Sequence, residues 1–197
     1  MTYVFFMFPL GVGIAISNRI GNTLPRNVHH AKVLAVATLI TVAIVFGFFI
    51  LAIYWYRAPI YRIFTNDPEV LAGCEAIWPL VCFYMWVLVM FGISTGIATG
   101  LGMQLTLGVW TLLYLWLFGL PATYYFAIIQ GQGLMAVWMW IWPPYLAINV
   151  TIGLNFVTCD WDEIAQRIRI REGLDKEGLE SLRLRESFKG PTYGAIA

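Results

Sequence analysis

A stretch of 84 residues, from position 76 to position 159, contains no Asp, Glu, Lys, Arg or His. In a soluble domain about one residue in four is charged, because charged side chains keep the surface hydrated. The uncharged stretch is instead long enough for three membrane-crossing helices of about 20 residues each, with short connections between them. We therefore expect an integral membrane protein and exclude a soluble globular domain.

Most of the charged residues lie at the C-terminal end of the chain. The whole chain is 60% hydrophobic and 12% charged, and its formal net charge is +1. Seven of the 12 Lys and Arg residues and eight of the 11 Asp and Glu residues come after position 159. This division predicts a transmembrane helical region over residues 1–158 and a polar tail over residues 159–197.

Hydropathy divides the first region into five apolar segments. Lipid offers no hydrogen-bond partners to peptide groups, so a segment crosses a bilayer only as a helix or as part of a closed barrel. These segments lack the alternation of polar and apolar residues that barrel strands require. The sequence therefore predicts an all-α, polytopic bundle of about five transmembrane helices. Their expected bounds are about 2–17, 33–56, 76–98, 106–129 and 134–157.

The basic residues between the apolar segments predict an orientation. Lys and Arg are concentrated in the cytoplasmic loops of membrane proteins. Because successive helices alternate sides, residues 18–32, the turn after Thr99 and the tail share one side, which holds ten Lys and Arg, against Arg57 and Arg62 on the other. We therefore expect a cytoplasmic tail. The N-terminus then starts outside, so we expect the chain to begin partway through a longer protein, after an odd number of earlier helices.

Several local patterns predict individual elements. In the tail, Trp161, Ile164 and Ile168 repeat at helical spacing between arginines, which predicts an amphipathic helix on the inner membrane surface, followed by a disordered end. Asp67 and Pro68 are typical of the cap and first position of a helix. Glycines at every fourth position, at 92, 96 and 100, favour close contact with another helix.

Short motifs follow one another in a recognisable order along most of the chain. They are Pro9-Leu10-Gly11, Ile20-Gly21-Asn22, Asn66-Asp67-Pro68, Gly100-Leu101-Gly102, Gly119-Leu120-Pro121, Gly131 with Trp138, and Asp160-Trp161. Their order and spacing resemble the C-terminal half of the multidrug and toxin extrusion (MATE) family, in its eukaryotic branch.

The resemblance implies a function in transport. It implies the second lobe of a secondary antiporter that has about twelve helices in two similar lobes around a central cavity. Such transporters export organic cations, drugs or metabolites in exchange for protons or sodium, here with the plasma membrane as the expected location. The implied partners are membrane lipid, a small organic cation, the coupling proton or sodium, and a missing N-terminal lobe.

Other classes of function find no support in the sequence. It contains no catalytic constellation within the membrane segments, and the adjacent pair His29-His30 lacks the further ligands of a metal site. It also lacks a basic surface suited to nucleic acid. We therefore expect no enzymatic activity, no cofactor, no metal and no nucleic-acid partner.

The resemblance also suggests where the functional residues lie. Gly21 and Asn22 form its loop motif after the first helix. The eukaryotic branch carries an acidic residue on the third helix, and counting forward from Pro79 places that position at Leu88, which cannot exchange a proton. Candidates to line the substrate cavity, where aromatic rings hold cations by cation–π contact, are Tyr84, Leu88, Tyr114 and Trp116.

The absence of an acid at Leu88 and of a first lobe motivates an alternative. The chain could instead be a truncated or diverged membrane protein that transports nothing and acts as a packing or regulatory partner. An intramembrane carboxylate is the usual group that couples an ion to a cationic substrate, because burial raises its pKa and a bound cation lowers it. The two hypotheses therefore differ in what an acid at position 88 would do.

Overall fold

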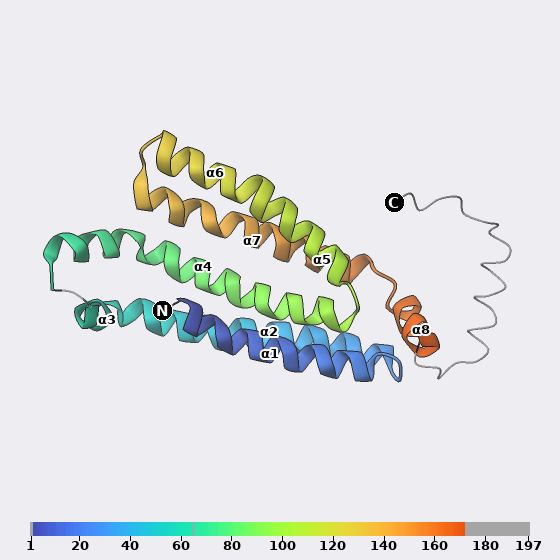
Figure 1. Ribbon diagram of the computed structural model, residues 1–197. Helices are drawn as coiled ribbons and strands as arrows, with labels where there is room; N and C mark the ends of the chain where they lie inside the picture. The colour runs from blue at the N-terminus through green and yellow to red at the C-terminus, as the bar shows by residue number, and fades with distance from the viewer. Residues whose placement is uncertain (1, 65, 172–197) are drawn as a thin grey trace.

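The computed structural model describes residues 2–64 and 66–171, and every regular element within them is a helix. Figure 1 shows the long helices side by side in an elongated bundle. The elements are α1 (Thr2–Thr23), α2 (Val28–Trp55), α3 (Arg57–Phe64), α4 (Pro68–Gly100), α5 (Gln104–Thr111), η1 (Leu112–Gly119), α6 (Leu120–Tyr124), η2 (Tyr125–Ile129), α7 (Gly133–Thr158) and α8 (Trp161–Arg171). The prediction of an all-α membrane bundle is confirmed.

Four helical segments in the described ranges are long and apolar enough to cross a membrane: Val28–Trp55, Pro68–Gly100, Gln104–Ile129 and Gly133–Thr158. The third of these is one rod, built from α5, η1, α6 and η2 in succession. The first predicted segment, now α1, is not among the four. Its last turns contain Ser17, Asn18 and Arg19, so its apolar part is shorter than the helix.

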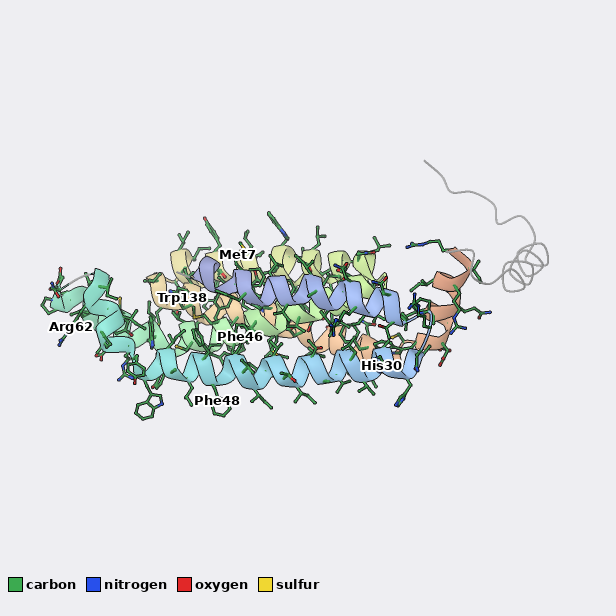
Figure 2. All side chains as sticks on the ribbon, turned by 90° about the horizontal axis from the view of Figure 1, so that it is seen from below. Met7, His30, Phe46, Phe48, Arg62 and Trp138 are labelled. Atoms are coloured by element: carbon green, nitrogen blue, oxygen red, sulfur yellow. The ribbon has the colours of Figure 1, made fainter. Side chains whose placement is uncertain are left out.

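The outer surface of the bundle is apolar, as a lipid-facing surface must be. Figure 2 shows Phe48 of α2 pointing away from the bundle, whereas Phe46 points into it. Phe48 is 70% exposed, and Met7 on α1 is 60% exposed. Extended apolar surface of this kind is rare on soluble monomers but matches the hydrocarbon of a bilayer.

The helices are longer than the apolar segments from which they were predicted. The first was expected over 2–17 but continues to Thr23, the second begins at Val28 rather than 33, and the third begins at Pro68 rather than 76. The bounds of the remaining two segments, expected over 106–129 and 134–157, move by no more than two residues. Polar side chains are excluded from hydrocarbon but not from a helix that projects into the headgroup layer. Hydropathy therefore underestimates the length of a membrane helix.

One consequence concerns the motif Gly21-Asn22, which was expected in a loop. Both residues lie in the last turn of α1, and the chain reverses after them, in a short turn that ends at Asn27. Asn27 caps α2, because its Oδ1 accepts a hydrogen bond from the backbone N–H of His30 at 3.0 Å. The assignment of Gly21 and Asn22 to a loop was wrong.

The other turns agree with their sequence signals. Asp67 caps α4 by accepting a hydrogen bond from the backbone N–H of Glu69 at 3.0 Å, with Pro68 at the first helical position. Between the later helices the backbone turns at Gly102, with φ of 73°, and at Gly131, with φ of 67°. Side chains other than hydrogen strain this left-handed conformation, which explains why glycine is used there.

Helix α4 lies at the centre of the bundle and contacts α1, α2 and α7. Val89, Ile93 and Ile97 follow one another along α4 and are completely buried. They form a core with Ile16 and Ile20 of α1 and with residues of α2. Contact with α4 therefore sets the positions of α1, α2 and α7, whereas the rod over Gln104–Ile129 packs mainly on α7.

The closest of these contacts joins α1 to α4 through glycine backbone. A methyl group added to Gly13 would lie 2.5 Å from the Gly92 carbonyl oxygen, and one added to Gly96 would collide with the carbonyl of Gly13. A methyl group on Gly100 would lie 2.8 Å from the Ser17 carbonyl oxygen. The predicted role of Gly92, Gly96 and Gly100 in close helix contact is confirmed: Gly13 is the partner of Gly92 and Gly96, and Ser17 is the partner of Gly100.

A short helix covers each end of the bundle. At one end, α3 packs on α4 through Tyr61, whose ring lies edge-to-face with Trp78 at 4.8 Å and whose hydroxyl donates to the Cys74 carbonyl at 3.5 Å. Burial, followed by the neighbouring Cys74, raises the pKa of Tyr61 to about 12, so this hydroxyl remains a donor at physiological pH. Arg57 pairs with Glu75 at 3.8 Å across the same junction.

At the other end, α8 is the expected helix of the tail, and its apolar side packs on the protein. Trp161 and Ala165 are buried in the same core as Leu24 and Ala31. The indole Nε1 of Trp161 donates to the Phe156 carbonyl at 2.9 Å. Only the remaining faces of α8 are therefore turned away from the bundle. The expected disordered end of the tail lies outside the described residues.

Substituting Gly96 with alanine tests the α1–α4 contact. We expect Gly96→Ala to lower the free energy of unfolding by about 1–3 kcal/mol, because the added methyl group forces two backbones apart. Gly11→Ala, on the facing helix α1, is the control: nothing lies within 4 Å of its added methyl group, and it should be neutral or slightly stabilising. Unfolding of each variant in mixed detergent micelles, followed by circular dichroism, measures the two changes in free energy. Equal changes would contradict the contact.

Candidate functional site

Aromatic side chains line the contact between α4 and α7. Tyr84 is 8% exposed, and its ring lies edge-to-face with Trp138 at 6.0 Å and with Tyr145 at 5.7 Å. Phe91 meets Tyr145 in the same geometry at 5.2 Å. Such pairs stabilise packing by about 0.5–1.5 kcal/mol each, beyond the area that they bury. We call Tyr84, Phe91, Trp138, Tyr145 and Asn149 the α4–α7 seam.

Asn149 brings an amide into this seam. Its Nδ2 donates to the Val87 carbonyl at 3.1 Å, which is the carbonyl just before Leu88. Its Oδ1 is buried and has no hydrogen-bond partner in the described part of the chain. An unpaired buried acceptor costs about 1–3 kcal/mol. The seam therefore contains one buried acceptor whose hydrogen-bonding capacity no described group uses.

A cavity of about 380 Å³ lies on the other side of α7, between this helix and η1. Most of its surface is apolar, and it is partly open to the outside of the bundle. On one wall, Trp110 and Tyr114 stack with ring centroids 5.6 Å apart, and the Tyr114 hydroxyl lies 3.2 Å from Thr151 Oγ1. Its lining residues are Trp110, Leu113, Tyr114, Leu117, Phe118, Pro143, Pro144 and Ala147.

The helix that forms this wall is wound more widely than an α-helix. Residues Leu112–Gly119 form π-helical turns, and Tyr125–Ile129 form a second such segment. Directly beside the cavity, Gly119 lies so close to Pro144 that an added methyl group would be 2.6 Å from its Cγ. Helical π turns of this kind recur at functional sites, because the wider turn moves side chains out of the regular register.

The four predicted cavity residues fall in three different places. Tyr84 and Leu88 lie one turn apart on α4, and both are buried, at 8% exposure. Tyr114 lines the cavity beside η1. Trp116 is 67% exposed on the outer surface and takes no part in the cavity. The structure therefore brings Tyr84 and Leu88 together and separates Tyr114 and Trp116 from them, with α7 between the seam and the cavity.

No titratable carboxylate lies in the seam or the cavity, because residues 76–159 contain none. In the described ranges, no group of three or more His, Cys, Asp and Glu side chains is arranged to hold a metal ion. The groups that the seam and the cavity offer are therefore aromatic rings, the amide of Asn149 and hydroxyl groups. Rings and an amide oxygen suit an organic cation with apolar parts.

Some residues of the site were missed from the sequence although a signal was present. Trp110 precedes Tyr114 by four positions, the spacing that puts two side chains on one helix face. Asn149 is an amide within an apolar segment, and polar groups at such positions are usually functional. Pro143 and Pro144 also line the cavity, a role that depends on which helix packs beside them.

Comparison with known proteins relates this geometry to transporters. Multidrug and toxin extrusion protein 1 of Danio rerio is 25% identical over 170 residues, which cover 86% of this chain and 29% of that protein. Multidrug and toxin extrusion protein 2 of Oryctolagus cuniculus is 25% identical over 177 residues, 88% of this chain and 29% of the relative. Protein DETOXIFICATION 41 of Arabidopsis thaliana is 23% identical, covering 82% and 33%. The chain thus spans about a third of the length of these relatives.

A solved structure shares the fold. The crystal structure of the eukaryotic MATE transporter AtDTX14 superposes with a TM-score of 0.79 at 20% identity, covering 86% of this chain and 38% of that one. At this level of identity, the likeness concerns the helix arrangement alone.

The family model named MatE matches residues 1–125, which include α1, α2, the central α4 and the aromatic wall of the cavity. This match covers more than half of the chain and agrees with the resemblance drawn from the motifs. The protein is an integral membrane protein that belongs to the MatE family.

Proposed function

We propose that this chain forms the C-terminal lobe of a secondary antiporter that exports organic cations, drugs or metabolites in exchange for protons or sodium. The observation that carries the proposal is the MatE match, because relatives in this comparison are named for multidrug and toxin extrusion. The packing of long apolar helices around α4 supports a lobe of fixed shape. Such a lobe moves against a partner lobe as a rigid body during alternating access.

The aromatic cavity supports an organic cation as the substrate. Its volume of about 380 Å³ falls within the range of about 300–1,000 Å³ that small-molecule sites occupy. The Trp110 indole offers a π face to a cation, and the leucine and proline side chains accommodate apolar groups. We assign substrate contact to Trp110 and Tyr114, which line this cavity.

Coupling to an ion needs a group that the transmembrane part of this chain lacks. A proton-coupled step requires a titratable side chain, and position 88 is leucine. We therefore propose that the coupling group belongs to the partner lobe. The Asn149 amide would then contribute to binding of the substrate or of sodium, without changing its own charge.

The distribution of charge supports an orientation. Helix α8 and the turn between α1 and α2 lie at one end of the bundle, near His30, and Arg62 lies at the opposite end (Figure 2). Most cations of the described chain are at the first end, as expected for a cytoplasmic side. We propose a cytoplasmic α8 and tail, in the plasma membrane, where an exporter acts on the cell's surroundings.

A second function is favoured by the burial of Leu88. A leucine that fills the α4 interior at this position suits helix packing better than ion exchange. In this alternative, the chain is a diverged membrane protein that binds or regulates another transporter and moves no substrate itself.

Transport by reconstituted vesicles distinguishes the two functions. We expect the protein, in its longest natural form, to move a fluorescent organic cation across vesicles under a proton or sodium gradient. Collapsing the gradient with an ionophore should stop the movement, because an antiporter has no other driving force. Cation movement that is absent, or equal to that of empty vesicles under both gradients, would leave only the second function.

Two tryptophans on the same rod test the cavity as the substrate site. We expect Trp110→Leu to raise the KM for the organic cation by about two- to thirty-fold, which corresponds to the loss of a cation–π contact of about 0.5–2 kcal/mol. Trp116→Leu removes the same ring from an outward-facing position and should leave KM unchanged. If both variants change KM equally, the cavity does not contact the substrate.

Position 88 tests the origin of coupling. We expect Leu88→Glu to make transport depend on pH near neutrality, because burial raises the pKa of a carboxyl in this position. Leu88→Gln has the same shape without a titratable proton and should leave the pH profile as it is. A pH profile that is identical in the two variants would show that position 88 does not take part in transport.

A further inference from the structure

One end of the bundle holds more positive charge than its own acidic groups can balance. In the described part of the chain, Arg19, Arg26, Lys32, Arg167, Arg169 and Arg171 lie at this end, with Asp160, Asp162 and Glu163. This end of the described chain therefore has six cations and three acids. The opposite end contains Arg57 and Arg62 with Asp67, Glu69 and Glu75, and so carries a slight negative charge.

Two of the three acids at this end, Asp160 and Glu163, are already engaged. Asp160 caps α8 by accepting from the backbone N–H groups of Asp162 and Glu163, at 3.0 Å and 3.3 Å. Glu163 pairs with Arg167 at 2.7 Å. We call Arg19, Arg26, Lys32, Arg169 and Arg171 the basic end. These five have no carboxylate partner among residues 2–64 and 66–171.

Two contacts join α8 to the turn between α1 and α2 and to the start of α2. The Arg169 Nε donates to the carbonyl of Pro25, next to Arg26. The Lys32 Nζ lies over the ring of Trp161 at 5.9 Å. The apolar side of α8 packs against the bundle. Its exposed side, which includes Arg171, therefore remains free to contact a partner outside the protein.

The position of the basic end along the bundle identifies that partner. Arg26 and Lys32 flank the start of α2, and α8 follows the end of α7, both of which are long enough to cross a membrane. Cations at the ends of such helices lie at the depth of lipid headgroups. Phosphate and carboxylate groups of anionic lipids complement clustered Arg and Lys side chains.

We propose that the turn between α1 and α2 and the exposed side of α8 form one binding surface for the headgroups of anionic phospholipids. The surface holds phosphatidylserine-like lipids beside α8 and thereby fixes the position of this helix against α1 and α2. It does not depend on the transport activity proposed above, and it is available whether or not a substrate is bound.

Lipid association with the reconstituted full chain tests this surface. Electron spin resonance of spin-labelled lipids measures how strongly phosphatidylserine and phosphatidylcholine associate with the protein in phosphatidylcholine bilayers. We expect a preference for phosphatidylserine that decreases at high salt, as screening predicts. In the double variant Arg26→Gln/Arg171→Gln it should fall by up to about five-fold for each cation removed. Both residues are exposed, so helix content by circular dichroism should not change.

Matched variants separate a defined surface from net charge. Arg57→Gln/Arg62→Gln removes the same charge from the opposite end and should leave the lipid preference unchanged. Arg167→Gln removes a cation of α8 that is already paired with Glu163, and it should have a smaller effect than Arg171→Gln. The proposal is overturned if the native chain shows no preference, if the double variant keeps all of it, or if the control pair loses as much.

Discussion

The bundle depends on how closely α1 approaches α4. At Gly13, Gly96 and Gly100, a carbonyl group of the facing helix occupies the space that a side chain would otherwise fill. Lipid tails are as apolar as leucine, so helices in a membrane gain little from burying apolar surface and associate mainly by close packing. Glycine allows that packing. With α1 held in this way, α4 becomes an interior helix whose opposite face is available to α7, and the aromatic seam and the cavity are built on that arrangement.

Much of the helical architecture could be predicted from the sequence, because it follows from the cost of placing charges and unpaired peptide groups in hydrocarbon. The 84-residue uncharged stretch, the cap at Asp67 and the glycine turns each depend on neighbouring residues only. The glycine repeat on α4 predicted a close contact but not its partner, Gly13, because the choice of partner depends on how the helices assemble. Helix ends such as Thr23 were missed, since a polar residue ends an apolar segment but does not end a helix.

The candidate site was harder to predict for a related reason. In a segment such as 106–129, almost every residue is apolar, so hydropathy gives no indication of which side faces protein. Tyr114 and Trp116 were therefore equivalent in the sequence, although one lines a cavity and the other is on the outer surface. The π-helical turns of η1 change the register further. Family resemblance directed attention to α4, but the amide of Asn149 reaches this region from another helix.

In the proposed arrangement, neutral helices cross the bilayer as packed rods. The turn between α1 and α2 and helix α8 lie on one side, and α3 lies on the other. The most direct test is labelling of single cysteines at positions 30 and 62 by a membrane-impermeant thiol reagent in sealed vesicles, after Cys74, Cys82 and Cys159 have been replaced. In molecules of one orientation, we expect the reagent outside the vesicles to label only one of the two positions. Labelling of both positions from the same side would contradict it.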